Sequence, residues 1–94
     1  MKLIAMAVVA SIALVAAGAA SAQEALAKSS GCLNCHAVDT KKIGPALKEI
    51  ATKYKGKADA PATLEAKLSS GKGHPAVKAS ADDVKSLVKW VLAL

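Results

Sequence analysis

The spacing of apolar residues along the chain predicts several short helices and no strand. The pattern is clearest at the C-terminal end, where apolar positions recur with the helical period and form a stripe that we expect to be buried. This stripe consists of Val84, Leu87, Val88, Val91 and Leu92, and it is extended by Trp90 and Leu94. Ser80 is placed to cap the start of this helix, with Asp83 three residues later as its reciprocal partner.

Three shorter helices are expected before it. The alanine-rich segment from Gln23 to about Ser30 forms the first. From Ala46 to about Lys55, apolar residues recur at positions i, i+3, i+4 and i+7, which marks one face of a helix. Pro61 suits the first turn of another helix, which ends near Gly71. The predicted fold is therefore all-α, with about four short helices.

The segment 1–22 has the pattern of an export signal rather than of a folded element. Lys2 gives a positive start, Leu3–Ala17 is almost entirely apolar, and Ala20–Ala22 has the small residues of a signal peptidase site. We expect cleavage at this site and export to the periplasm, which leaves one domain at residues 23–94. The alternative is an uncleaved membrane anchor, because the apolar stretch approaches the length of a bilayer span. The small residues and the lack of a positive stop-transfer cluster favour removal, so no stable membrane insertion is expected afterwards.

The five residues Cys32-Leu33-Asn34-Cys35-His36 carry the clearest chemical signal in the chain. C-x-x-C-H is the pattern to which a c-type haem is attached, with a thioether from each cysteine and the histidine bound to iron. Cys32 and Cys35 are the only cysteines, so a single role accounts for both. We therefore expect one covalently bound haem c, with His36 as an iron ligand.

Two other uses of these residues fit less well. A zinc site would need four tetrahedral ligands, but the chain offers only the motif's own side chains and His74, and Cys35 and His36 are adjacent. A thiol–disulfide exchange centre also uses C-x-x-C, but it normally lies at the start of a helix in a βαβ unit. No segment of this chain alternates like a strand.

The domain at residues 23–94 is short of core-forming side chains. Domains of this size bury only about 60% of the surface that their unfolded chains expose. The chain has no Phe, and its only aromatic side chains besides the histidines are Tyr54 and Trp90, which we interpret as packing residues. A large apolar macrocycle bonded to the chain would supply the missing core, so we expect the haem-free chain to fold poorly.

Together these features resemble the small bacterial class I cytochromes c. The resemblance rests on three stretches, Gly31–Lys41, Ile43–Ala46 and Val88–Leu92, and it covers nearly all of residues 23–94. It implies a fold of about four short helices wrapped around one covalently bound haem. It also implies one-electron transfer to and from other proteins, and no enzymatic activity.

The resemblance assigns roles to three further residues. In this family the first and last helices cross at a small residue that packs against an aromatic one, which would be Gly31 and Trp90 here. The carbonyl of a proline after the haem motif accepts the other N–H of the proximal histidine, and Pro45 is the matching residue. Its physical role would be to set the tautomer and orientation of His36.

The chain departs from the family at the sixth iron ligand. Family members supply a methionine sulfur from a long loop before the last helix, but here the only methionines are Met1 and Met6, which leave with the signal. The loop at residues 71–79 is short and contains His74, and we expect this imidazole to replace the methionine. The alternatives are an open or water-bound iron, or a lysine from the same loop. An open iron would make the protein a haem-based binder or sensor of diatomic gases.

The charged residues narrow the class of partner. The chain has 13 lysines, no arginine and 7 acidic residues, a net charge of +6, and only Lys2 leaves with the signal. The lack of arginine and the export signal argue against nucleic acid. Dispersed lysines usually form a solvated face, but lysines around a haem edge would steer the protein toward redox partners with acidic docking surfaces. We therefore expect a periplasmic electron carrier.

Overall fold

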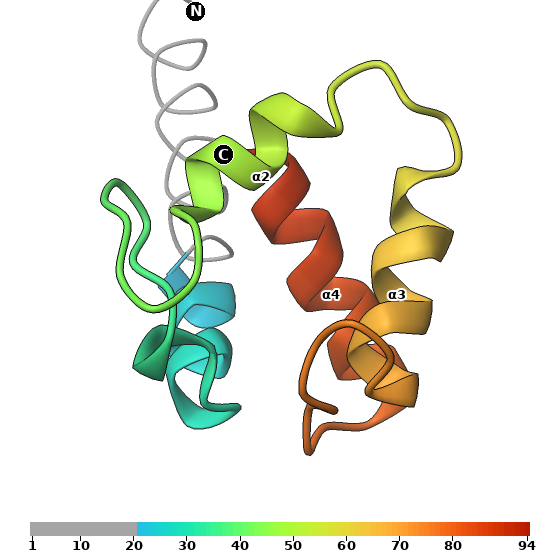
Figure 1. Cartoon of the computed structure of the whole chain (residues 1–94). Helices are drawn as coiled ribbons and strands as arrows, with labels where there is room; N and C mark the ends of the chain where they lie inside the picture. The colour runs from blue at the N-terminus through green and yellow to red at the C-terminus, as the bar shows by residue number, and fades with distance from the viewer. Residues whose placement is uncertain (1–20) are drawn as a thin grey trace, which may run out of the picture.

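The computed structural model describes residues 21–94, and within this range it contains helices and no strand. The elements in chain order are a helix at residues 21–29, the 3₁₀ turn η1 (Cys32–Asn34), α2 (Leu47–Lys53), α3 (Ala60–Ser70) and α4 (Ala81–Leu92). α4 packs against both α2 and α3. In Figure 1, α2 crosses the C-terminal end of α4 and α3 lies alongside α4, with the first helix on the other side.

The predicted export signal, residues 1–22, lies almost wholly outside the described residues, so its cleavage stays a prediction. Between residues 21 and 94, no helix combines the length and the hydropathy that a bilayer span requires.

The ends of the helices follow the local sequence. Ser80 Oγ accepts a hydrogen bond from the backbone N–H of Asp83 at 3.1 Å, which is the predicted Ser80 cap of α4. The reciprocal bond from the Asp83 side chain is not formed among the described residues. α3 has Pro61 in its first turn and ends at Gly71, whose φ of 76° is a left-handed conformation that favours glycine. α2 is shorter at both ends than predicted, and the chain leaves it through a turn that contains Gly56 at φ 78°.

The buried core is small. Its central cluster consists of Ala27, Leu47, Leu87 and Trp90, none more than 8% exposed. Among residues 21–94, no large side chain is fully buried. In the predicted stripe of α4, Val84, Leu87, Val88 and Trp90 are buried and Val91 packs against the core cluster. Leu92 is only half-buried, and Leu94 lies beyond the end of the helix and is 37% exposed.

The structure corrects the predicted contact between Gly31 and Trp90. A Cβ added at Gly31 would meet only the side chain of Asn34 within 4 Å. The small residue that shares the core cluster with Trp90 is Ala27, one turn earlier in the first helix. Gly31 has a different role, because its left-handed φ of 85° turns the chain from the first helix into η1.

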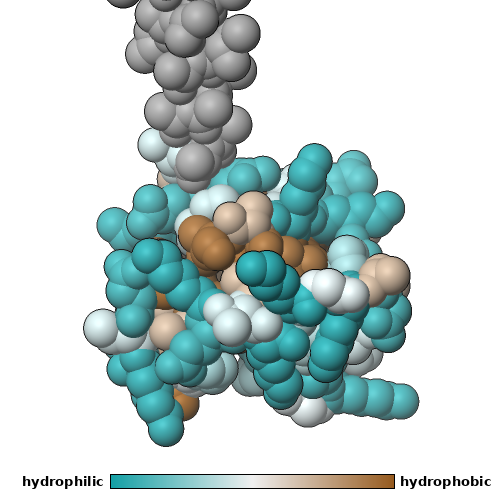
Figure 2. Space-filling view, turned by 90° about the horizontal axis from the view of Figure 1, so that it is seen from above, coloured by the Kyte–Doolittle hydropathy of each residue, from teal (hydrophilic) through white to brown (hydrophobic). Residues whose placement is uncertain are grey.

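Some apolar side chains reach the surface. Figure 2 shows an apolar area in the middle of the face seen from above, surrounded by hydrophilic residues. The large apolar side chains that are exposed in the described part of the chain are Ile43, at 80%, and Leu94. Little apolar surface is buried among the helices themselves, and poor folding of the haem-free chain stays a prediction.

Candidate haem site

The 3₁₀ conformation of η1 brings the two cysteines to one edge of the chain. Cys32 begins the turn and Cys35 caps its end. A 3₁₀ helix has about three residues per turn, so side chains at i and i+3 eclipse each other. The backbone N–H groups of Cys35 and His36 both donate to the carbonyl oxygen of Cys32, at 3.3 and 3.0 Å. The three-residue spacing of the motif therefore places both sulfurs at the same cavity.

The two thiols are half-buried and are not joined in a disulfide. Burial raises the pKa of the Cys32 thiol, and a hydrogen bond to its backbone opposes this shift only in part. Thiols that catalyse disulfide exchange instead have lowered pKa values, so the exchange alternative is disfavoured. Residues 21–94 contain no group of three His, Cys, Asp or Glu side chains that could hold a metal ion, as a zinc cage would require.

His36 is oriented by the loop that follows the motif. Its Nδ1–H donates to the carbonyl oxygen of Pro45, with an N···O distance of 2.6 Å. Because a carbonyl oxygen only accepts, this bond assigns the proton to Nδ1 and leaves the lone pair on Nε2. The structure thus brings together the two residues that the family resemblance paired.

Gly44 packs against the ring of His36, a contact that the sequence analysis missed. A Cβ at Gly44 would lie 2.5 Å from Cε1 of His36 and 2.9 Å from its Nδ1. Only a residue without a side chain fits this close to the ring. The signal was present in the Gly44-Pro45 pair, but only the proline was interpreted.

Replacing Gly44 by alanine should push the His36 ring away from the Pro45 carbonyl. Overpacking of this kind typically costs about 1–3 kcal/mol, so the haem-loaded variant should melt at a lower temperature and lose part of its low-spin absorption. Gly56→Ala is the control, because alanine is strained there at φ 78° but meets nothing within 4 Å. If both variants lost stability and kept the wild-type absorption, Gly44 would not position His36.

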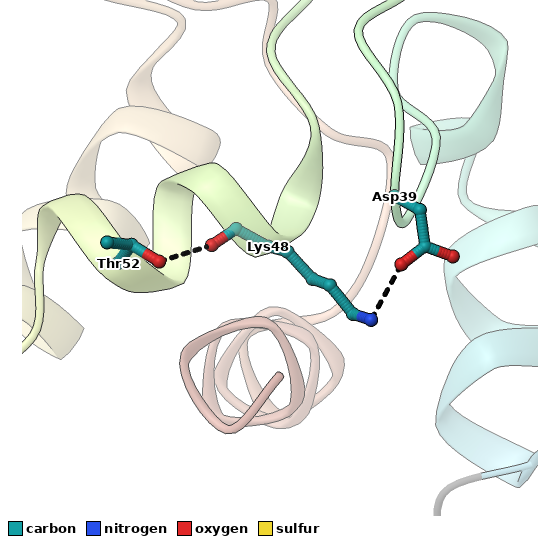
Figure 3. Close-up of polar contacts among 3 residues, drawn as sticks. All are labelled: Asp39, Lys48 and Thr52. Atoms are coloured by element: carbon teal, nitrogen blue, oxygen red, sulfur yellow. Dashed lines mark hydrogen bonds and ion pairs between the residues drawn. The ribbon is translucent and has the colours of Figure 1, made fainter.

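The start of α2 is tied to the chain just after His36. The backbone N–H groups of Leu47 and Lys48 donate to the first two carbonyls after His36, at 2.9 and 3.1 Å. Lys48 Nζ also forms an ion pair with Asp39 Oδ1 at 2.6 Å, and the backbone carbonyl of Lys48 accepts a hydrogen bond from Thr52 Oγ1 (Figure 3). Because the Lys48–Asp39 ion pair is exposed, it contributes at most about 1 kcal/mol. The two backbone hydrogen bonds of Leu47 and Lys48 therefore do most to hold the start of α2 against the chain after His36.

A cavity of about 670 Å³ opens beside these residues. Both cysteines and both histidines of the chain line it, together with apolar side chains from the helices. The apolar lining includes Ile50 of α2, Leu64 and Leu68 of α3, and Leu87 and Trp90 of α4. The volume lies within the range of about 300–1,000 Å³ that is usual for cofactor sites. Two thiols, two imidazoles and apolar walls in one cavity fit a haem.

His74 lines this cavity from the loop between α3 and α4. The loop is turned by Gly71 and Gly73, at left-handed φ angles of 76° and 75°. It is closed at its base by Val77, whose N–H donates to the carbonyl of Leu68 at 2.8 Å. His74 is therefore held on a short, closed loop, half-buried against the cavity.

The rings of His36 and His74 lie parallel. Their centres are 6.0 Å apart and their planes differ by 4°. An imidazole nitrogen lies about 2.0–2.1 Å from a bound zinc ion. The centre of the ring lies roughly 1 Å beyond that nitrogen, so two imidazoles in line on one metal would have ring centres about 6 Å apart. The measured separation of the ring centres is therefore one that two imidazoles bound to a single metal atom would have.

Charged side chains and a tyrosine line the edge of the cavity. Glu49, Lys53 and Lys67 are exposed there, and Tyr54 is half-buried. The ammonium groups of Lys53 and Lys57 lie 5.7 and 5.4 Å from the centre of the Tyr54 ring, within the range of cation–π contacts. Tyr54 thus lines the cavity with two ammonium groups close to its ring.

Comparison with known proteins agrees with this geometry. The family model for cytochrome c matches residues 15–94. Cytochrome c-552 of Nitrosomonas europaea is 43% identical over 90 residues, which cover 87% of this chain and 87% of the relative. Cytochrome c-551 of Pseudomonas aeruginosa is 41% identical over 88 residues, which cover 85% of each chain.

Solved structures agree as well. The class 1 cytochrome MtoD from Sideroxydans lithotrophicus ES-1 superimposes with a TM-score of 0.72 at 39% identity, covering 78% of this chain and 92% of that one. Wild-type cytochrome c552 of Nitrosomonas europaea gives a TM-score of 0.67 at 41% identity, covering 76% and 98%. The predicted all-α class I fold is confirmed. The chain belongs to the cytochrome c family of electron-transfer proteins and carries one covalently attached haem c.

Proposed function

We propose that the protein is a periplasmic electron carrier whose haem is attached through Cys32 and Cys35 and whose iron is bound by His36 and His74. The haem supplies reversible one-electron chemistry when it is bound. The chain supplies the two sulfurs, the two imidazoles and an apolar cavity, and Pro45 orients the proximal ring. This role transforms no substrate, so we propose no enzymatic reaction.

The observation that supports bis-histidine ligation is the pair of parallel rings, 6.0 Å apart, in a chain whose methionines lie only at positions 1 and 6. In the loop between α3 and α4, residues 73–77 line the cavity. Among the described residues that line it, neither Lys72 nor Lys78 is found, which favours His74 over a lysine ligand. Two imidazoles on one iron leave no position open, which favours an electron carrier over a binder of gases.

Optical spectra of the purified holoprotein test this proposal. Bis-histidine ligation should keep the iron low-spin in both oxidation states, without the near-infrared absorption of ferric haem bound to methionine sulfur. The reduced protein should take up carbon monoxide slowly, because a protein ligand already fills the sixth position. A high-spin ferric spectrum with immediate uptake of carbon monoxide would overturn the assignment and favour the gas-binding alternative.

We also propose that lysines at the cavity edge steer the protein toward redox partners with acidic docking surfaces. Lys53 at the end of α2 and Lys67 on α3 are exposed and line the cavity, and Lys57 lies over the ring of Tyr54, which also lines it. Glu49 offsets only part of this charge. Like charges around an opening raise the association rate of partners with the opposite charge.

The salt dependence of electron transfer should depend on the charge of the reaction partner. Oxidation of the reduced protein by anionic hexacyanoferrate(III) should slow between 0.01 and 0.1 M salt, since the Debye length falls from about 30 to about 10 Å. Oxidation by cationic tris(phenanthroline)cobalt(III) should accelerate over the same range. Stopped-flow kinetics measure both rates.

A pair of double variants locates the charge responsible. Lys53→Gln/Lys67→Gln should weaken both salt dependences. Lys85→Gln/Lys89→Gln, on α4 and outside the haem cavity, changes the net charge equally and should have the smaller effect. Equal effects of the two double variants would show that net charge, rather than the cavity edge, governs the rate.

A further inference from the structure

His74 has a hydrogen bond of the same kind as the one that orients His36. The Nδ1 of His74 lies 2.7 Å from the carbonyl oxygen of Pro75, compared with 2.6 Å between His36 Nδ1 and the carbonyl of Pro45. In each pair the ring N–H donates, because a carbonyl can only accept, so each ring keeps its lone pair on Nε2. The two imidazoles share one tautomer and one type of anchoring group.

The backbone around His74 is suited to hold this carbonyl in place. Pro75 has a restricted φ, and a residue before proline is restricted to extended conformations. On the other side, Gly73 adopts a left-handed φ of 75° that favours glycine. The bond from the Val77 N–H to the Leu68 carbonyl closes the loop two residues after Pro75. These features restrict the backbone of the loop, and the bond to Pro75 restricts rotation of the His74 ring.

We propose that the Pro75 carbonyl is the positioning group for the sixth iron ligand: it selects the tautomer of His74 that coordinates through Nε2 and holds its ring parallel to that of His36. This inference rests on the proposed ligation of iron by both histidines. The ring planes differ by only 4°, and each ring is bonded through Nδ1 to a separate proline carbonyl. Such anchoring gives the iron one ligand arrangement instead of a mixture of ring orientations, and it raises the basicity of the distal imidazole.

Two spectroscopic measurements on the wild-type holoprotein read this arrangement directly. The angle between two axial imidazole planes sets the splitting of the ferric d orbitals, so parallel rings should give one rhombic electron paramagnetic resonance signal with three resolved g-values. Perpendicular rings would give a single feature at large g instead. In the ¹⁵N-labelled reduced protein, nuclear magnetic resonance should show two slowly exchanging Nδ1–H protons, one from each of His36 and His74.

Pro75→Ala tests the positioning role by keeping the carbonyl and releasing the backbone that holds it. The Nδ1–H of His74 should then exchange about three- to tenfold faster, as expected for weakening of one hydrogen bond. The proton of His36 should not change, and a second low-spin signal should appear from rotated rings. Pro61→Ala, in the first turn of α3 and outside the haem cavity, is the matched control and should change neither spectrum.

The possible results distinguish two claims: that the Pro75 carbonyl positions His74, and that His36 and His74 both bind the iron. A low-spin, bis-histidine spectrum with a single large-g feature, or rapid exchange of the His74 proton in the wild type, would overturn the role of Pro75 and leave the ligation intact. Wild-type spectra for Pro75→Ala would also overturn it. A high-spin wild type would overturn the ligation itself. If Pro75→Ala failed to fold, the two wild-type measurements would still decide.

Discussion

Replacing His74 by alanine should turn a six-coordinate, low-spin haem protein into one that binds carbon monoxide at once. The substitution removes the only imidazole in the chain besides His36, and no methionine follows residue 6. Water or a lysine should then occupy the sixth position, and the ligand set should change with oxidation state, which slows electron transfer. Soret absorption and stopped-flow binding of carbon monoxide to the reduced protein measure the change.

Two companion variants define what His74 contributes. His74→Met should raise the reduction potential if the short loop lets the sulfur reach the iron, because methionine ligation raises it. Val77→Ala truncates another residue of the same loop that lines the cavity, and it should stay low-spin. A wild type that is already high-spin, with His74→Ala leaving its spectrum unchanged, would contradict the electron-carrier proposal and support the gas-binding alternative.

Replacing Cys32 and Cys35 together by serine should leave a haem-free chain that has no cooperative fold. The central buried cluster contains only Ala27, Leu47, Leu87 and Trp90, and further large apolar side chains, among them Ile50, Leu64 and Leu68, line the cavity. Without the macrocycle these side chains would face water. The expected result is a weak helical signal in far-ultraviolet circular dichroism, no sigmoidal thermal transition, and release of any added haem by acid–acetone extraction.

Graded controls separate the loss of the haem from the introduction of serine. Each single cysteine variant keeps one possible thioether and should retain haem through extraction. Ala62→Ser/Ala66→Ser adds two hydroxyls at exposed positions of α3 and should keep the wild-type melting transition in the holoprotein. A haem-free double cysteine variant that still melts cooperatively would show that the side chains alone form a sufficient core.

Most of the secondary structure could be predicted because its signals are local. The cap formed by Ser80 and Asp83, the proline at the start of α3 and Gly71 at its end act within one turn of chain. The apolar stripe of α4 can likewise be recognised from the helical spacing of its residues alone. The 3₁₀ turn at η1 was not predicted, although the spacing of the cysteines requires both sulfurs on one edge.

Predictions about contacts between distant segments were less successful. Gly31 was expected to meet Trp90, but Ala27 shares the buried cluster instead, because which small residue of the first helix faces α4 depends on how the helices are rotated. The close fit of Gly44 on the ring of His36 was missed for a similar reason. A glycine that makes room for a ring differs in no local way from one that makes a turn.

By itself, the sequence determined the helical class, the helix caps and the C-x-x-C-H motif, and with them the covalent haem, because each depends on residues only a few positions apart. The tertiary structure decided that His74 faces the same cavity as His36, with parallel rings and matching bonds to Pro75 and Pro45. These two histidines are separated in the sequence by α2, α3 and the loops around them, so only the packing of the helices could bring them together.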